Sequence, residues 1–143
     1  MALVVDSGVM VAALVDSGPV GTWADQLLGS DHLVAPHLMP VEAANIFRRA
    51  SLAGEISADA ASLAHADLLA LRLELFGYGP LAGRVWELRE NITAYDAWYV
   101  ALAESLGVPL ATVDMKLSGA PGPRCPFVTP PPEVGLRTVG KNG

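Results

Sequence analysis

Four acidic residues share one feature, which is that each follows a predicted strand or lies in the first turn of a predicted helix. They are Asp6, Glu42, Asp96 and Asp114. In a parallel α/β sheet, the carboxyl ends of the strands and the starts of the following helices meet at one edge, where ligands bind. Like charges gathered there are costly without a cation. Because Mg²⁺ and Mn²⁺ prefer oxygen ligands, the pattern predicts a Mg²⁺ or Mn²⁺ site.

Each acid also has an ordinary structural interpretation. Asp96 stands three residues after Thr93, a spacing that resembles a capping box at a helix start. The negative charge of Glu42 would interact favourably with the dipole of its own helix. Asp6 and Asp114 suit turns that follow strands. The four acids together favour a site, because all of them fall at one predicted edge while the other eleven acids are scattered.

Short apolar runs alternate with helical segments along the chain. We expect strands over residues 2–5, 32–35, 73–76 and 110–113, with an edge strand over 127–129. Helices are expected over residues 9–15, from the Gly18–Pro19 break to 28, and over 40–53, 57–71, 81–89 and 93–106. This alternation predicts an α/β fold, with a small, mostly parallel sheet flanked by helices on both faces. We expect one domain over residues 1–130, followed by an extended or disordered tail over 131–143; six of the eleven prolines lie between Pro121 and Pro132, where the tail begins.

The composition excludes several classes of protein. Hydrophobic residues make up 52% of the 143 residues and charged residues 17%, which excludes an intrinsically disordered chain. One cysteine excludes an internal disulfide framework and fits a reducing compartment. We see neither a signal peptide nor a membrane-spanning run, and therefore expect a cytoplasmic protein without a membrane partner. A net charge of −6 does not attract nucleic acid by its bulk field, so any activity on RNA needs a local basic rim or metal ions.

Four segments of the chain resemble the motifs of PIN-domain proteins, and most closely those of the VapC toxins of bacterial toxin–antitoxin pairs. These segments are Val4–Ser7, Val41–Asn45, Tyr95–Ala103 and Leu110–Asp114. The resemblance covers residues 2–130 and is most specific between residues 93 and 114. It implies a Rossmann-like domain and a metal-dependent ribonuclease with RNA as its substrate. It also implies frequent homodimers and a cognate antitoxin that blocks the site.

The resemblance extends to individual site positions. Asp6, Glu42, Asp96 and Asp114 occupy the acidic positions of the family, Ser7 and Thr112 its small hydroxyl positions, and Asn45 a frequent polar position. Asp6 and Asp96 would contact the metal directly, and Glu42 and Asp114 would complete the site or position a water. The chain departs from many relatives directly after Asp114, where Met115 precedes Lys116, which puts the substrate rim in doubt.

Carboxylates and a hard cation suit phosphodiester hydrolysis, because divalent ions activate water and neutralise charge at phosphorus. The histidines at positions 32, 37 and 65 are too dispersed to predict a zinc cluster. Two alternatives remain open. One is a PIN-like module that binds RNA or protein without catalysis. The other is another Mg²⁺-dependent phosphoryl hydrolase, although Gly8 replaces the second Asp that a haloacid-dehalogenase-like enzyme requires.

Several other residues have weaker functional interpretations. Arg48, Lys116 and Arg124 are possible RNA contacts, whereas Arg49 more simply belongs to a solvated helix face. We interpret His37 as a loop or packing residue. Tyr95, Trp98, Tyr99 and Leu102 form a stripe at helical spacing, which is more typical of core packing or a dimer interface than of base stacking.

Overall fold

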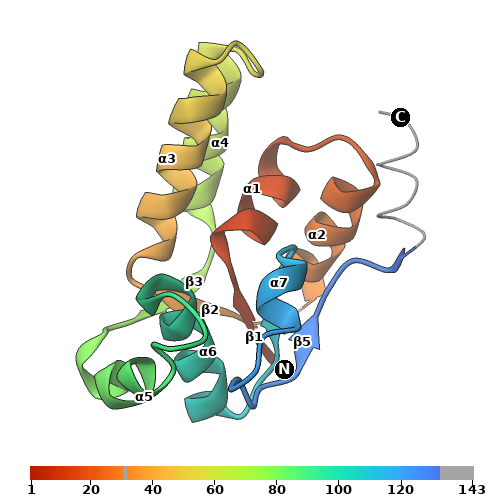
Figure 1. The fold of residues 1–143 in the computed structure, drawn as a ribbon. Coiled ribbons are helices and arrows are strands. Elements are labelled where there is room, and N and C mark those ends of the chain that lie inside the picture. Colours follow the sequence, from red (N-terminus) through yellow and green to blue (C-terminus); the bar gives the residue numbers. More distant parts are fainter. Residues whose placement is uncertain (31, 133–143) are drawn as a thin grey trace. The chain divides into compact units, whose positions relative to one another are not determined.

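The short apolar runs of the sequence form one parallel sheet in the computed structural model of the chain (Figure 1). The structure describes residues 1–30 and 32–132. These residues divide into two units. The sheet unit comprises residues 1–6, 32–37 and 73–129, and the helical unit comprises residues 7–30, 38–72 and 130–132. Each unit is described below by itself.

The sheet has five strands in the order β3-β2-β1-β4-β5, and every neighbouring pair is parallel. The strands are β1 Ala2–Val5, β2 His32–Pro36, β3 Leu73–Phe76, β4 Leu110–Ala111 and β5 Phe127–Val128. Val4 and Val5 point to opposite faces of β1, and both are fully buried, as the apolar run predicted. The α/β class and the parallel sheet are therefore confirmed.

Three helices and a short 3₁₀ turn complete the sheet unit. They are η1 Gly79–Leu81, α5 Ala82–Glu87, α6 Ala94–Leu106 and α7 Met115–Ser118. Helix α6 begins where Thr93 Oγ1 accepts a hydrogen bond of 3.1 Å from the Asp96 amide, and it ends at Gly107, whose φ of 66° suits glycine. Its middle is almost continuously buried, and it contacts β1, β2 and β4.

The helical unit contains α1 Ser7–Val15, α2 Pro19–Ser30, α3 Met39–Leu52 and α4 Ala58–Ala70. Ser57 caps α4 by accepting a 3.0 Å hydrogen bond from the Ala60 amide. Pro40 stands in the first turn of α3, as predicted, because a helix start needs no amide donor there. Phe47 and Leu68 are buried, where α3 packs on α4.

The structure corrects four details of the predicted elements. Helix α1 begins at Ser7, two residues before the helix expected over residues 9–15. The helix expected over 81–89 is divided between η1 and α5 and ends at Glu87. Strand β4 stops at Ala111 because Thr112 and Asp114 use side-chain hydrogen bonds to turn the chain into α7, a helix that the apolar pattern did not predict.

No helix in the described part of the chain combines the length and the apolar character needed to cross a bilayer. The boundary at residue 130 and the tail over 131–143 stay predictions, because residues 133–143 lie outside the described residues.

We expect two glycines of α2 to respond oppositely to substitution by alanine. A Cβ on Gly21 would overlap the carbonyl oxygen of Asp16 and lie 2.6 Å from its carbonyl carbon. Gly21→Ala should therefore lower the free energy of unfolding by about 1–3 kcal/mol. Gly29→Ala is the matched control, since a Cβ there meets nothing within 4 Å, and it should raise stability by about 0.5–1 kcal/mol. Urea titration of both variants measures the difference, and equal effects would contradict this account of the α1–α2 turn.

Candidate functional site

The ends of three adjacent strands form the floor of the site. The Asp6 amide donates a 3.2 Å hydrogen bond to the Ala111 carbonyl, which extends the β1–β4 pairing by one residue. The Thr112 amide donates a 3.0 Å hydrogen bond to the Val128 carbonyl on β5. Asp6 and Thr112 therefore stand side by side at the carboxyl edge of the sheet, where the strand order predicts ligand binding.

Thr112 connects two of the predicted acids. Its side chain is fully buried, and its hydroxyl donates a hydrogen bond to Oδ2 of Asp6. The Thr112 hydroxyl oxygen in turn accepts a 3.0 Å hydrogen bond from the Asp114 amide. Because that amide can only donate, the hydroxyl proton is directed to the Asp6 carboxylate. Asp114 then caps α7, accepting hydrogen bonds of 2.9 and 3.1 Å from the amides of Lys116 and Leu117.

Asp96 brings a third acid to the same unit. It is half-buried in the first turn of α6. Burial raises the pKa of its carboxyl above the usual value, and the negative charge of Asp114 raises it further, while a hydrogen bond with the Thr93 side chain opposes the shift. Asp96 and Asp114 thus repel each other, and both would be favoured in their charged forms by a cation placed between them.

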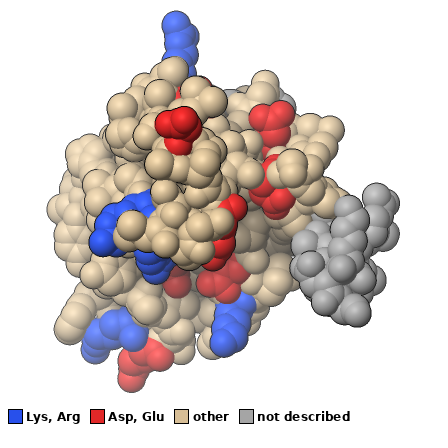
Figure 2. Space-filling model, turned by 90° about the horizontal axis from the view of Figure 1, so that it is seen from above, with Lys and Arg blue, Asp and Glu red and all other residues tan. Residues whose placement is uncertain are grey.

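A hollow of about 450 Å³ lies beside this acidic pair. Its charged and hydroxyl-bearing lining residues are Arg89, Glu90, Thr93, Asp96, Asp114 and Lys116. One wall is the turn between α5 and α6, and the other comes from the start of α7. The face of the molecule in Figure 2 likewise carries separate acidic and basic groups on a mostly uncharged surface.

The donor set fits a hard cation, although the described residues contain no ready-made metal cluster of three or more His, Cys, Asp or Glu side chains. Mg²⁺ keeps several waters and needs only one or two carboxylates, which Asp96 and Asp114 can supply. Zinc ligands do not gather in this hollow. Burial raises the pKa of the Cys125 thiol to about 11, and His32 forms a 2.9 Å contact with Glu74.

The remaining predicted site residues belong to the helical unit. Ser7 begins α1 and is half-buried. Glu42 is half-buried in the first turn of α3, and Asn45 is exposed one turn later. The structure thus links Asp6 to Asp114 through hydrogen bonds with Thr112, and Asp96 to Asp114 through electrostatic repulsion. Glu42 belongs to the helical unit.

The basic residues proposed as RNA contacts differ in whether they line the acidic hollow. Lys116 lines the hollow, as expected of a possible substrate contact, but Arg124 does not. Arg48 lines a different hollow in the helical unit, together with Phe47 and His65. Arg89 was not predicted, because an arginine in a turn carries no periodic signal.

Core packing, which the sequence favoured for the aromatic stripe, holds for Tyr99 and Leu102 but not for Tyr95, and His37 lies in a loop as interpreted. Tyr99 and Leu102 are buried in the core, whereas Tyr95 is 61% exposed. The Trp98 ring packs edge-on against Tyr78, with centroids 5.4 Å apart. The His37 amide donates to the Phe76 carbonyl at 3.0 Å, beyond the end of β2.

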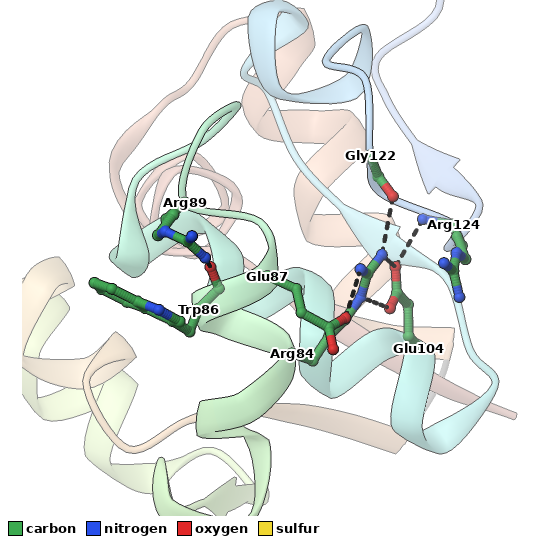
Figure 3. Close-up of polar contacts among 7 residues, drawn as sticks. All are labelled: Arg84, Trp86, Glu87, Arg89, Glu104, Gly122 and Arg124. Atoms are coloured by element: carbon green, nitrogen blue, oxygen red, sulfur yellow. Dashed lines mark hydrogen bonds and ion pairs between the residues drawn. The ribbon is translucent and has the colours of Figure 1, made fainter.

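A network centred on Arg84 and Glu104 fixes the segments around the hollow (Figure 3). Arg84 on α5 binds both carboxylate oxygens of Glu104 on α6, at 2.7 and 3.2 Å, and donates to the Gly122 carbonyl at 2.9 Å. Burial alone would raise the pKa of Glu104, but hydrogen bonds from Arg84 and the Arg124 amide lower it. The network therefore ties α5, α6 and the segment before β5 together.

Residues 3–122 match the family model of the PIN domain. The chain is 42% identical over 123 residues to Ribonuclease VapC1 of Mycobacterium tuberculosis, with 85% of this chain and 92% of the relative covered. It is 36% identical over 129 residues to Ribonuclease VapC9 of the same species, with 90% and 98% covered.

The fold also matches the solved structure of VapBC2 from Rickettsia felis bound to a DNA fragment from their promoter. The TM-score is 0.64 at 14% identity, with 90% of this chain and 98% of that chain covered, so this likeness concerns the fold alone. The chain therefore belongs to the PIN-domain family, as its four acidic motifs predicted, and its relatives include the mycobacterial VapC ribonucleases.

Proposed function

We propose that this chain is a metal-dependent endoribonuclease and the toxin of a toxin–antitoxin pair. The observation that carries the proposal is that hydrogen bonds of Thr112 connect Asp6 and Asp114 at the carboxyl edge of the sheet. The charge of Asp114 also repels that of Asp96. Relatives that are 36–42% identical over most of the chain are named ribonucleases, which supports RNA as the substrate class.

Asp6, Asp96, Asp114 and, from the helical unit, Glu42 would hold a Mg²⁺ or Mn²⁺ ion. When bound, such an ion activates a water and neutralises charge on a phosphodiester. Thr112 donates a hydrogen bond to one oxygen of the Asp6 carboxylate and so fixes the orientation of that acid. Ser7 and Asn45 would support the site from the helical unit.

The basic side chains that line the hollow would bind the phosphates of the RNA backbone. Lys116 and Arg89 line the same hollow as Asp96 and Asp114, so phosphate oxygens can pair with positive side chains beside the acidic centre. They supply the local basic rim that a chain of net charge −6 needs in order to hold RNA. In-line attack by water would leave a 5′-phosphate and a 3′-hydroxyl.

The proposed partners are an RNA substrate, a cognate antitoxin and a second copy of the chain as a homodimer. A structure of similar fold contains VapBC2, the protein pair from Rickettsia felis. A basic antitoxin side chain would neutralise the same acidic pair that a metal ion neutralises, and arginine suits this role because its planar fork pairs with two oxygens. Antitoxin and metal would therefore compete.

We expect Asp6→Asn to lower RNA cleavage by about 100-fold or more, because the variant loses several kcal/mol of charge stabilisation at phosphorus. Cleavage of a labelled RNA by wild-type protein should require Mg²⁺ or Mn²⁺, stop with EDTA and leave 5′-phosphate ends. Asp59→Asn is the matched control, since Asp59 is an exposed acid in the first turn of α4. A folded Asp6→Asn variant with wild-type cleavage would refute the proposal. RNA binding without cleavage by wild-type protein would instead indicate a non-catalytic binding module.

We expect Asp96→Asn to stabilise the metal-free protein at neutral pH. The pKa of Asp96 is raised in the folded state, so folding favours its protonated form, and the penalty grows as pH rises through that raised value. The gain in Tm should vanish near pH 3, where the carboxyl is protonated in both the folded and the unfolded state.

Thermal melts with and without Mg²⁺ test whether Asp96 contributes to cation binding. Millimolar Mg²⁺ should raise the Tm of wild-type protein and leave that of Asp96→Asn nearly unchanged, because a ligand stabilises the state that binds it. Asp59→Asn should show the wild-type response to Mg²⁺ and a slightly lower Tm, since it loses a favourable charge at a helix start. Equal Mg²⁺ responses of wild type and Asp96→Asn would contradict a role in cation binding.

We expect Thr112 to position Asp6 and Asp114 through its hydroxyl group, and not through its methyl group. Thr112→Val leaves Oδ2 of Asp6 and the Asp114 amide without this partner, and should lower stability by about 1–3 kcal/mol and cleavage about 10- to 100-fold. Thr112→Ser retains the hydroxyl and should recover most of the cleavage. If Val and Ser reduced cleavage equally, the methyl packing and not the hydrogen bonds would be responsible.

A further inference from the structure

We propose that Trp86 and Arg89 form a stacking platform for a nucleobase of single-stranded RNA, next to the phosphate that enters the acidic hollow. The proposal rests on the proposed ribonuclease function and adds a substrate-positioning surface to it. The platform lies at the end of α5 and in the turn that follows, outside the four acidic motifs of the sequence.

Trp86 offers a large aromatic surface to solvent. Its side chain is 66% exposed, although it belongs to a helix whose neighbouring residue Val85 is buried. The Arg89 guanidinium lies over the indole, 4.7 Å from the ring centroid, and its Nη1 donates a 2.8 Å hydrogen bond to the Trp86 carbonyl (Figure 3). The arginine therefore orients the ring and reduces the motion that base stacking would have to restrict.

The charge of Arg89 remains available for a phosphate. Within residues 1–30 and 32–132, no acidic partner forms an ion pair with it, whereas Arg84 on α5 forms ion pairs with Glu87 and Glu104. The contrast is visible in Figure 3, where Arg84 joins the network and Arg89 lies over Trp86. The two arginines thus differ in role: Arg84 belongs to the structural network, and Arg89 is exposed.

Arg89 also connects the aromatic ring to the candidate active site. It lines the hollow together with Asp96, Asp114 and Lys116. A nucleotide has the matching pair of groups, a flat base and a phosphate joined by a sugar. With its phosphate beside Arg89 and Lys116, the adjoining base can stack on Trp86. Stacking accepts any base, because every base has a π-face, so the platform would position the strand without reading its sequence.

The test measures binding and cleavage of a short, fluorescein-labelled, single-stranded RNA of mixed sequence. Trp86→Ala and Trp86→Leu should each raise KM about tenfold and change kcat little, whereas Trp86→Phe, which retains an aromatic face, should remain near wild type. Leucine separates apolar contact from stacking. Equilibrium binding is measured in the Asp6→Asn background, where the same order of affinities is expected without cleavage.

Arg89 is tested through the salt dependence of binding. Arg89→Ala should reduce the slope of log K against log salt by about 0.7, the value for one phosphate contact on a single strand. Arg72→Ala is the matched control, since Arg72 is exposed and lies outside the lining of the hollow, and it should leave the slope unchanged. Equal slopes for wild type and Arg89→Ala would overturn the phosphate contact.

The outcomes separate this proposal from the function on which it rests. If wild-type protein cleaves RNA and Trp86→Ala binds and cleaves it equally well, the platform is refuted and the function stands. If the protein binds RNA through Trp86 but does not cleave it, the platform stands and the function fails. If Trp86→Ala loses binding to the antitoxin and retains binding to RNA, the surface docks protein and the proposal is overturned.

Discussion

The buried hydroxyl of Thr112 couples the neighbouring strands β1 and β4 to the acids that follow them. It donates to Asp6 at the end of β1 and accepts from the Asp114 amide beyond β4, so one atom fixes a carboxylate and a helix start together. Thr112 is the one fully buried polar residue among those described, and both of its hydrogen bonds are needed to offset its desolvation. The same atom ends β4 early and allows Asp114 to cap α7.

Two acids on helix α6 show how environment separates a structural role from a functional one. Glu104 near the end of the helix is half-buried, yet a bidentate arginine and a backbone amide lower its pKa. Asp96 at the start of the helix is also half-buried, but its pKa is raised by burial and by a second acid. A carboxyl group with a raised pKa, next to a second acid in a hollow, is typical of a site that binds a positively charged ligand.

The sequence predicted the parts of the fold that depend on local pattern. The apolar runs located the strands, and Thr93 marked the start of α6. The α7 turn escaped prediction because four residues are too few for a helical period, and its cap became visible only through the hydrogen bonds of Asp114. Motif spacing singled out the acids, and the structure connects Asp6 with Asp114 through Thr112. The spacing carried no information on Trp86 at the end of α5 and Arg89 in the turn that follows, because these two residues meet only in the folded chain.

If the proposed function holds, the mixed charge of the hollow would make metal binding and RNA binding depend on each other. Without a cation, Asp96 and Asp114 repel a phosphate that Arg89 and Lys116 attract, so the proposed site holds RNA weakly. A divalent ion on the acidic pair would reverse this local repulsion, and by linkage the RNA phosphate would then strengthen metal binding by the same factor. A basic antitoxin side chain would satisfy the same two acids without supplying an activated water. The repulsion between Asp96 and Asp114 therefore favours either a productive cation or an inhibitory one, and the ligand that is present determines whether the proposed enzyme is active.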